Sequence, residues 1–436
     1  MVDEDDPTAR RTDDESARRA VAAVWRIESA RIVATLTRVV GDFGLAEDLA
    51  QEALAEALEQ WPGTGVPRNP GAWLTTVAKR RAIDGWRRRE RYDDRLAAIA
   101  HDLEAEQRQA ADAPPWDPDR IDDDVLRLVF TACHPVLARE AQVALTLRVV
   151  GGLSSEEIAN AFLVPTATVQ QRIVRAKKAL ADAGAPFEVP GRDEFAARLA
   201  GVLAVVYLVF TEGHAASSGG DVLRPDLARE AMRLGRVLAA LVPDEPEPGG
   251  LVALMELTAA RFPARVDAAG DPVPLDRQDR TRWDRTLIAH GRAALARAER
   301  VAGRRDRGLG PYALQAVIAE CHAVAPSVAA TDWPRIVAAY DAIARIAPSP
   351  VVELNRAVAV SMAPEPDGGP AVALALVDAL ADDRRLRLSH LLPTVRGELL
   401  ARLGRASEAR AEFEEAARRT RNDRERAVLL AKAAGA

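Results

Sequence analysis

Cysteine is nearly absent from this chain. The 436 residues include only Cys133 and Cys321, which lie far apart and form no CxxC pair. This spacing argues against a disulfide framework and against a thiolate metal site, and we expect no metal and no cofactor. Isolated cysteines of this kind fit a cytoplasmic protein.

Lysine and net positive charge are also scarce. Only Lys79, Lys177, Lys178 and Lys432 are lysines, so arginine carries most of the positive charge. The 65 acidic residues outnumber the 59 basic ones and give a formal charge of −6. Any affinity for nucleic acid must therefore come from a local basic patch rather than from the whole chain.

Long hydrophobic runs are missing. The most apolar stretch, Leu199 to Phe210, has 12 residues, whereas a helix that spans a bilayer needs about 20. We interpret it as a buried core helix and expect no membrane association. The first residues, Met1 to Glu15, are acidic and polar, unlike a basic and then apolar signal peptide, and predict a disordered tail over 1–18.

Helical periodicity dominates the rest of the sequence, with little strand-like alternation, and predicts an all-α protein. Hydrophobic residues make up 48% of the chain and aromatic ones 4%, which suits more than one helix-rich domain. A loop over 62–70 interrupts the first helical block, and a charged stretch around 90–118 separates it from the second. The expected domains are 19–95, a linker over 96–121, 122–184, and a helical extension over 195–436.

The last hundred residues carry a faint internal repeat. The residues Gly368, Ala373, Val377 and Ala381 recur thirty-six positions later as Gly404, Ala409, Phe413 and Ala417. The spacing is close to the 34 residues of a tetratricopeptide repeat, a pair of packed helices. We expect such repeats from about residue 335, with 364–369 as the loop inside one pair; chance recurrence in an alanine-rich sequence remains open.

A helix-turn-helix pattern lies between residues 153 and 180. Ser154 followed by Glu157 forms a capping box, which predicts a short helix with Ile158 and Ala159 facing inward. After a break of three or four residues, Pro165 is compatible with the first turn of a second helix. The apolar face of that second helix consists of Val169, Ile173, Ala176 and Leu180.

The other face of the second helix is polar and basic, and no carboxylate occurs from Thr166 to Ala181. Amides near a helix N-terminus read base edges in the major groove, while cations bind phosphates. A solvated helix of an ordinary bundle is the alternative. The candidate DNA-binding residues are Thr168, Gln170, Gln171, Arg172, Val174, Arg175 and Lys178.

A second basic cluster spans residues 79 to 91, where seven cations face two acids. Trp73 and Trp86 flank or interrupt it, and cations beside aromatic rings suit a single-stranded or melting nucleic acid. Trp73 also begins an apolar face, which favours a core position for this residue over a contact with bases.

An acidic helix precedes this cluster. Leu45, Leu49, Ala53, Ala57 and Trp61 share one side, which predicts a buried face. The other side is acidic, so it cannot lie on phosphates; it is either solvated or faces a basic protein surface. The acidic side consists of Glu47, Asp48, Gln51, Glu52, Glu56 and Glu59.

Together these segments resemble the bacterial sigma factors of the extracytoplasmic-function type. The motif over 48–53 is similar to the helix that binds core RNA polymerase, 73–84 to the helix that melts and reads the minus-10 element, and 168–176 to the helix that reads the minus-35 element. The resemblance covers about 19–184 and implies that 19–95 is sigma domain two and 122–184 is sigma domain four. It implies core polymerase and promoter DNA as partners.

The resemblance also assigns site residues. It implies polymerase binding by Asp48, Gln51, Glu52 and Glu56. It implies minus-10 binding by Asn69, Trp73, Lys79, Arg80, Arg81, Asp84, Arg87 and Arg88. Family members often have Asn where this chain has Arg80, so that this position is expected either to read bases differently or to contact a phosphate.

The remainder of the chain resembles the subgroup with a long tetratricopeptide-like C-terminal extension, on residues 206–213 and 347–359. In that subgroup the extension, rather than a membrane-bound anti-sigma protein, is thought to control activity. We therefore expect the extension to contact the sigma domains or a regulatory protein.

Two other classes were weighed. An enzyme would need a catalytic set, but His214, His290, His322 and His390 belong to no HExxH or GxSxG motif, and the sequence contains no P-loop. A helix-turn-helix regulator that acts without core polymerase is the main alternative, although it leaves the acidic helix and the basic cluster over 79–91 without a role. We expect a non-enzymatic transcription factor.

Overall fold

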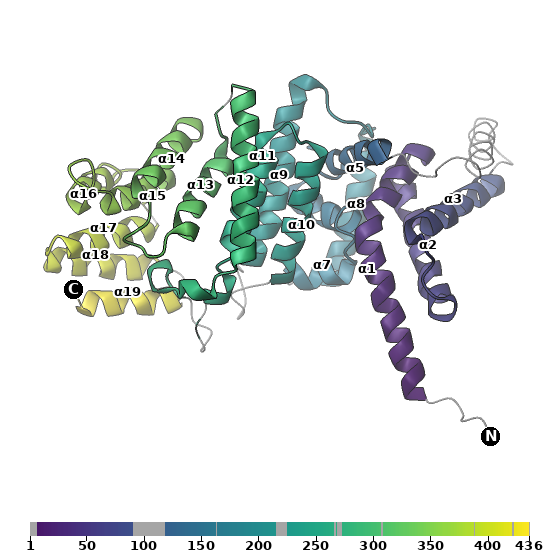
Figure 1. The fold of residues 1–436 in the computed structure, drawn as a ribbon, viewed down its shortest axis with the longest axis horizontal. Coiled ribbons are helices and arrows are strands. Elements are labelled where there is room, and N and C mark those ends of the chain that lie inside the picture. The colour runs from purple at the N-terminus through teal and green to yellow at the C-terminus, as the bar shows by residue number, and fades with distance from the viewer. Residues whose placement is uncertain are drawn as a thin grey trace. The chain divides into compact units, whose positions relative to one another are not determined.

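A computed structural model of the chain describes residues 7–89, 118–162, 164–214, 225–265, 267, 273–306, 308–387, 389–420 and 423–435. These residues form α-helices, three short 3-10 helices and connecting loops, and none of them lies in a strand (Figure 1). The expected all-α fold is confirmed. The chain divides into two compact units, Met1–Leu241 and Val242–Ala436.

The first unit begins with a three-helix group. Its helices are α1 (Pro7–Val40), α2 (Phe43–Thr64) and α3 (Pro70–Arg89). Gly41 has a φ of +70°, which ends α1, and the Asp42 carboxylate then accepts a hydrogen bond of 2.7 Å from the Leu45 N–H and caps α2. The indole of Trp61 on α2 meets that of Trp73 on α3 edge to face, with ring centroids 5.3 Å apart.

Two boundaries in this group differ from those expected. Helix α1 begins at Pro7, inside the segment that composition assigned to a disordered tail. Helix α2 continues through Pro62 to Thr64, so the loop before α3 is shorter than the Pro-Gly pattern indicated. A proline so close to a helix end removes little hydrogen bonding, and Gly65, with a φ of +79°, ends the helix instead.

The described part of the first unit contains six more helices: α5 (Pro118–Ala132), α6 (Arg139–Val149), α7 (Ser155–Phe162), α8 (Thr166–Asp182), α9 (Arg192–His214) and α10 (Pro225–Leu241). Helix α5 starts within the last part of the expected linker; residues 96–117 of that linker lie outside the described residues. Helices α9 and α10, where the expected extension begins, pack on each other and on α5, and α9 also contacts α6.

Helix α9 contains the most apolar stretch of the sequence. Among the described helices it is the one that is long and apolar enough to cross a membrane. Its apolar side chains are nevertheless covered, since Val202, Val205 and Val209 are at most 1% exposed and lie under α5, α6 and α10. The structure therefore agrees with the interpretation of Leu199 to Phe210 as a buried core helix.

The second unit begins with α11 (Pro246–Ala259), which packs against α12 (Arg285–Arg304) and α13 (Pro311–Val324). Between α11 and α12 lie the 3-10 helices η1 (Phe262–Ala264), η2 (Leu275–Arg277) and η3 (Arg280–Arg282). Two glycines, which have no Cβ, allow these helices to approach closely. A Cβ at Gly291 would lie only 2.8 Å from Leu257 Cγ, and one at Gly250 only 2.6 Å from Ala313 Cβ.

The last six helices are α14 (Trp333–Ile346), α15 (Pro350–Met362), α16 (Pro370–Asp378), α17 (Leu391–Arg402), α18 (Ala406–Arg419) and α19 (Asp423–Gly435). Each packs on its neighbour in the chain, and α17, α18 and α19 lie side by side in Figure 1. The loop expected over 364–369 does separate two helices, and Ala373, Val377, Ala409 and Phe413 share one core. Ala381 follows the end of α16 and is exposed, so the repeat is imperfect there.

Candidate nucleic-acid and polymerase interface

Helices α7 and α8 form the helix-turn-helix. The Ser154 N–H donates to Glu157 Oε2 at 2.7 Å, and the Glu157 N–H donates to Ser154 Oγ at 3.1 Å, so the expected capping box is confirmed. Ile158 and Ala159 are buried, as predicted. Pro165 stands one position before α8 rather than in its first turn, where its extended backbone leads into the helix.

The two faces of α8 separate as expected. Val169, Ile173, Ala176 and Leu180 are buried, and the opposite face is polar. Five of its side chains are exposed, one of them apolar: Val174 is 64% exposed. Thr168 and Arg172 are half-buried. Arg172 lines a pocket together with residues of α6. The exposed members are Gln170, Gln171, Val174, Arg175 and Lys178.

Helix α3 distributes its candidate residues differently. The Asn69 side chain accepts a hydrogen bond of 3.1 Å from the Ala72 N–H and caps the helix, and Trp73 is half-buried against Trp61. Arg80 and Asp84 are exposed and Lys79 is half-buried. The side chains of Arg87 and Arg88 lie outside the described residues.

Arg81 does not extend into solvent. Its guanidinium donates to Glu56 Oε2 at 2.8 Å and to Glu52 Oε2 at 3.1 Å, which joins α3 to the acidic helix α2. The hydrogen bond to Glu56 raises the pKa of Arg81, and Glu52 adds to the effect, although burial opposes it. One candidate DNA contact is therefore paired with two candidate polymerase contacts inside the same group of helices.

The acidic side of α2 is not solvated throughout. Glu47, expected on the exposed side, is buried at 3% exposure. Its carboxylate accepts from Arg148 Nε at 3.1 Å and from Lys177 Nζ at 2.5 Å, so burial of the charge is offset by two cations. Of the two alternatives for the acidic side, Glu47 therefore fits the one that faces basic protein groups, because Arg148 and Lys177 cover that part of the helix.

Lys177 joins the helix-turn-helix to the three-helix group of α1, α2 and α3. It lies on α8, next to the exposed DNA-binding candidates, and its Nζ also donates to Asp48 Oδ1 at 2.7 Å. Burial lowers the pKa of Lys177, but Glu47 and Asp48 outweigh it and raise the pKa, so the lysine stays charged. The sequence argument had assigned Asp48 to polymerase binding and had left Lys177 without a role.

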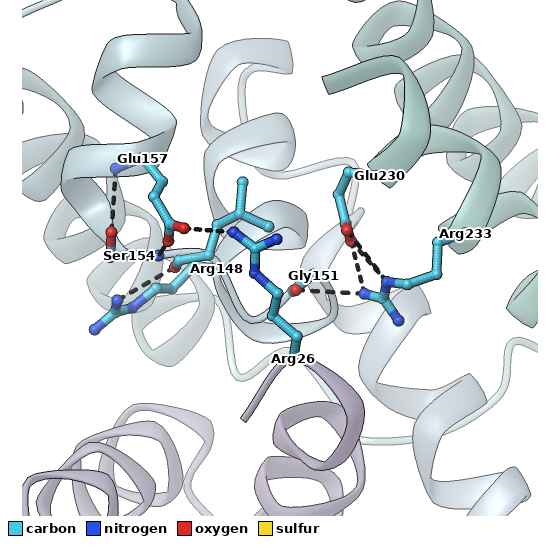
Figure 2. A network of polar contacts seen from close by, with 8 residues as sticks. Arg26, Arg148, Gly151, Ser154, Glu157, Glu230 and Arg233 are labelled. Carbon is cyan, nitrogen blue, oxygen red and sulfur yellow. Dashed lines mark hydrogen bonds and ion pairs between the residues drawn. The ribbon is translucent and has the colours of Figure 1, made fainter. Parts of the chain in front are cut away.

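Helix α1 makes further contacts with the helix-turn-helix half. Arg26 Nη2 pairs with Glu157 Oε1 at 2.5 Å, so the capping-box glutamate also binds the first helix (Figure 2). Gly152 has a φ of +69°, and a Cβ there would lie 2.6 Å from Ser29 Oγ. The turn before α7 therefore approaches α1 in a way that only glycine permits.

A third contact of α1 involves α5. Arg38 Nε donates to Asp124 Oδ2 at 2.9 Å, and Arg127 donates to the other oxygen of Asp124 at 2.6 Å. Asp124 lies near the start of the domain expected over 122–184. It is buried here as part of a helix contact.

The start of the expected extension also contacts the turn that precedes α7. Arg233 of α10 donates to the carbonyl oxygens of Val150 and Gly151 at 3.1 and 3.3 Å, while Glu230 accepts from its guanidinium at 2.7 Å and positions it (Figure 2). Arg198 of α9 donates to the Phe130 carbonyl at 3.0 Å. Helices α9 and α10 are thus part of the packing around the helix-turn-helix.

Two neighbouring reactive side chains of α13, Glu320 and Cys321, are held within the second unit. Glu320 forms ion pairs with Arg292 and Arg335, both at 3.0 Å, and the Cys321 thiol beside it is buried, which raises its pKa. Among the residues that the structure describes, no cluster of His, Cys, Asp and Glu could hold a metal ion.

Comparison with known proteins identifies both halves of the first unit. Residues 26–92 match the family described as sigma-70 region 2, residues 127–180 match sigma-70 region 4, and residues 198–299 match a family of unknown function, DUF6596. The chain is 44% identical to the uncharacterized protein R00370 of Rhizobium meliloti over 90% of both chains. No solved structure matches.

A second relative carries a functional name. The chain is 32% identical to the probable ECF RNA polymerase sigma factor SigI of Mycobacterium tuberculosis over 162 residues, which are 36% of this chain and 53% of SigI. The regions and their order define a sigma factor, a protein of transcription initiation that binds core RNA polymerase and promoter DNA. The chain belongs to the extracytoplasmic-function sigma factors and carries the DUF6596 region behind its region 4.

Proposed function

We propose that the chain directs core RNA polymerase to a set of promoters, with α2 and α3 in sigma domain two, α7 and α8 in sigma domain four, and residues 195–436 as a modulating extension. The observation that carries the proposal is the exposed polar face of α8, free of carboxylates from Thr166 to Ala181, on a capped helix-turn-helix. A regulator acting without polymerase would use the same face, but it would have no use for region 2.

The minus-35 readers follow from exposure on α8. Gln170 and Gln171 lie near the N-terminus of α8 and are exposed, so their amide groups suit hydrogen bonding to base edges. The exposed Val174 suits a thymine methyl group. Arg175 and Lys178, further along the helix, suit phosphates, and the half-buried Thr168 and Arg172 support the edge of this surface.

The minus-10 and polymerase contacts follow from α3 and α2. Arg80 and Asp84 are exposed for promoter contact, with Lys79 and Trp73 beside them and Asn69 at the helix start. Arg87 and Arg88 belong to the same proposed surface by sequence. On α2, Asp48 is 66% exposed and Glu52 54%, whereas Glu56 and Gln51 are partly covered, so polymerase would compete for groups that Arg81 and Lys177 now hold.

The described conformation is not that of a promoter complex. Elements named minus-10 and minus-35 lie about 25 base pairs apart, which is roughly 85 Å along B-DNA. In this structure α8 touches α2 through Lys177 at 2.5 and 2.7 Å. We therefore assign the structure to a closed state, in which domains two and four hold each other and must separate before both promoter elements are bound.

The role proposed for the extension follows from its first two helices. Arg198 and Arg233 bind backbone carbonyls on both sides of the domain-four helices, and α9 supplies part of their core. The extension therefore restrains the position of domain four relative to α1, and its release or support would change how readily the closed state opens.

The test is run-off transcription with purified core polymerase on a genomic fragment library, together with co-elution of the chain and core enzyme. We expect stoichiometric co-elution and transcripts from discrete start sites. Specific DNA binding without polymerase association would favour the independent regulator. For the extension, Arg233→Ala is expected to change transcription severalfold at equal polymerase occupancy, with exposed Arg236→Ala as the matched change on the same helix.

A further inference from the structure

An arginine cluster lies in the second unit, far in sequence from the promoter-binding helices. Arg261 follows α11, Arg280 begins η3, and both guanidinium groups lie near the ring of Trp283, with Cζ at 5.8 and 4.6 Å from its centroid. His322 of α13 lies beside them, and its ring meets Trp333 edge to face at 5.4 Å. We refer to Arg261, Arg280, Trp283 and His322 as the arginine cluster.

Among the residues that the structure describes, the two guanidinium groups of this cluster form no ion pair. Elsewhere in the second unit arginines pair with carboxylates, as Arg292 and Arg335 do with Glu320. Within the described residues, no carboxylate pairs with Arg261 or Arg280: Arg261 Nε donates to the Gln278 amide oxygen at 3.2 Å. Arg280 Nη1 donates to the His322 and Ala325 carbonyls at 2.6 and 2.8 Å.

The pKa directions agree with this geometry. Burial, together with the neighbouring Arg265 and Arg280, lowers the pKa of Arg261 to about 10. Burial and the two arginines Arg261 and Arg280 also lower the pKa of His322 to about 4, so its ring is neutral at pH 7. Such mutual repulsion is what a bound anion would relieve.

Two donors of the cluster have no acceptor. Arg280 Nη2 and Trp283 Nε1 are fully buried and make no hydrogen bond in the part of the chain that the structure describes. A buried donor without an acceptor costs about 1–3 kcal/mol, and proteins rarely leave one unless a ligand or water completes it. Here an unpaired guanidinium nitrogen and an unpaired indole nitrogen occur in one cluster of excess positive charge.

We propose that the arginine cluster binds the phosphate group of a small molecule. Two guanidinium groups match a dianion, and a tetrahedral phosphate offers oxygens in several directions, as donors from η3 and from the end of α11 require. A planar carboxylate carries one charge and fits such donors less well. The site would give the extension a chemical input that is separate from polymerase and from DNA.

The test uses the full-length chain and titration calorimetry with inorganic phosphate and with glycerol phosphate, at constant ionic strength. We expect saturable binding of both, with acetate and chloride at least tenfold weaker. Arg261→Gln is expected to weaken phosphate binding about tenfold or more, since hydrogen bonds to charged groups are the strong ones. The matched control is Arg282→Gln. Arg282 is exposed and lies on η3, the 3-10 helix that also carries Arg280, and its replacement should change binding less than twofold.

Arg280→Gln should also abolish binding, but this residue holds two backbone carbonyls and its loss can unfold the region. Arg261→Gln therefore decides the matter, because within the described residues the Arg261 side chain donates its hydrogen bond to another side chain, Gln278, and to no backbone carbonyl. The proposal is overturned if neither phosphate probe binds saturably, if acetate competes equally, or if Arg261→Gln binds phosphate as the parent does. None of these outcomes depends on transcription, so the sigma-factor assignment is tested separately.

Discussion

Lys177 provides the sharpest test of the closed state. It lies on the helix proposed to read the minus-35 element, yet its Nζ contacts Glu47 and Asp48 of α2 and no DNA-facing position. Its neighbour Lys178 is exposed on the same helix. Lys177→Ala should therefore open the closed state, whereas Lys178→Ala should weaken promoter binding and leave the closed state intact.

The magnitude follows from burial of the partners. Glu47 has a side chain only 4% exposed, and breaking a buried pair costs about 3–5 kcal/mol when the remaining charge is left alone. Arg148 still pairs with Glu47, and Asp48 is 66% exposed and contributes about 0–1 kcal/mol. We expect a net cost of about 1–3 kcal/mol, or roughly a 5- to 150-fold shift toward the open state.

The assay is a distance measurement between α2 and α8 in the full-length chain. Spin labels at exposed Ala55 and Asp182, introduced as cysteines, report the separation, because the native Cys133 and Cys321 are buried. The parent and Lys178→Ala should give one short distance. Lys177→Ala should add a population at longer distances, and that variant should bind core polymerase faster.

The opposite result would refute the reasoning. A single unchanged short distance in Lys177→Ala, with far-ultraviolet circular dichroism equal to that of the parent, would show that these ion pairs do not hold the domains together. A long distance already present in most of the parent population would show that the closed state is not the ground state.

Three further outcomes are expected. Asp48→Arg combined with Glu52→Arg should abolish co-elution with core polymerase at unchanged helicity, because like charges opposed at an interface cost several kcal/mol; unchanged co-elution would contradict the assignment of α2. Gln171→Ala should relax preference at one or two upstream base pairs, whereas Arg175→Ala should weaken all promoters alike and reduce the salt slope by about one unit; an identical uniform loss in both would remove the distinction. His322 should make the second unit less stable as pH falls, because its pKa is about 4 in the folded state and 6.5 in the unfolded state. Between pH 7 and 4.5 the free energy of unfolding, measured by urea titration, should fall by about 2–3 kcal/mol. If a His322→Gln variant shows the same fall, His322 is not its cause.

The local features were well determined by the sequence. Ser154 and Glu157 form their capping box within four residues, and Val169, Ile173, Ala176 and Leu180 form one buried stripe. Both depend on contacts inside one helix or on the 3.6-residue period, so that a linear pattern is enough to predict them. The order of the motifs was likewise enough to indicate regions 2 and 4, which the comparisons then showed.

Boundaries that depend on competing local preferences were less well predicted. The acidic composition before residue 19 suggested disorder, yet α1 begins at Pro7. Pro62 suggested the end of a helix, yet α2 runs to Thr64, because a proline in the last turn disturbs few hydrogen bonds.

Contacts between helices distant in the chain were decided by tertiary structure alone. The sequence did not indicate that Glu47 and Lys177, 130 positions apart, lie together; the tertiary structure places the Lys177 Nζ 2.5 Å from Glu47 Oε2. The arginine cluster is the same kind of feature, since Arg261, Arg280 and His322 come from three separate segments. The sequence by itself determined which helices form and which faces they bury, because those depend on neighbours a few residues away. Which charges meet, which stay unpaired and which domain covers another depend on packing across the whole unit, and only the tertiary structure decided them.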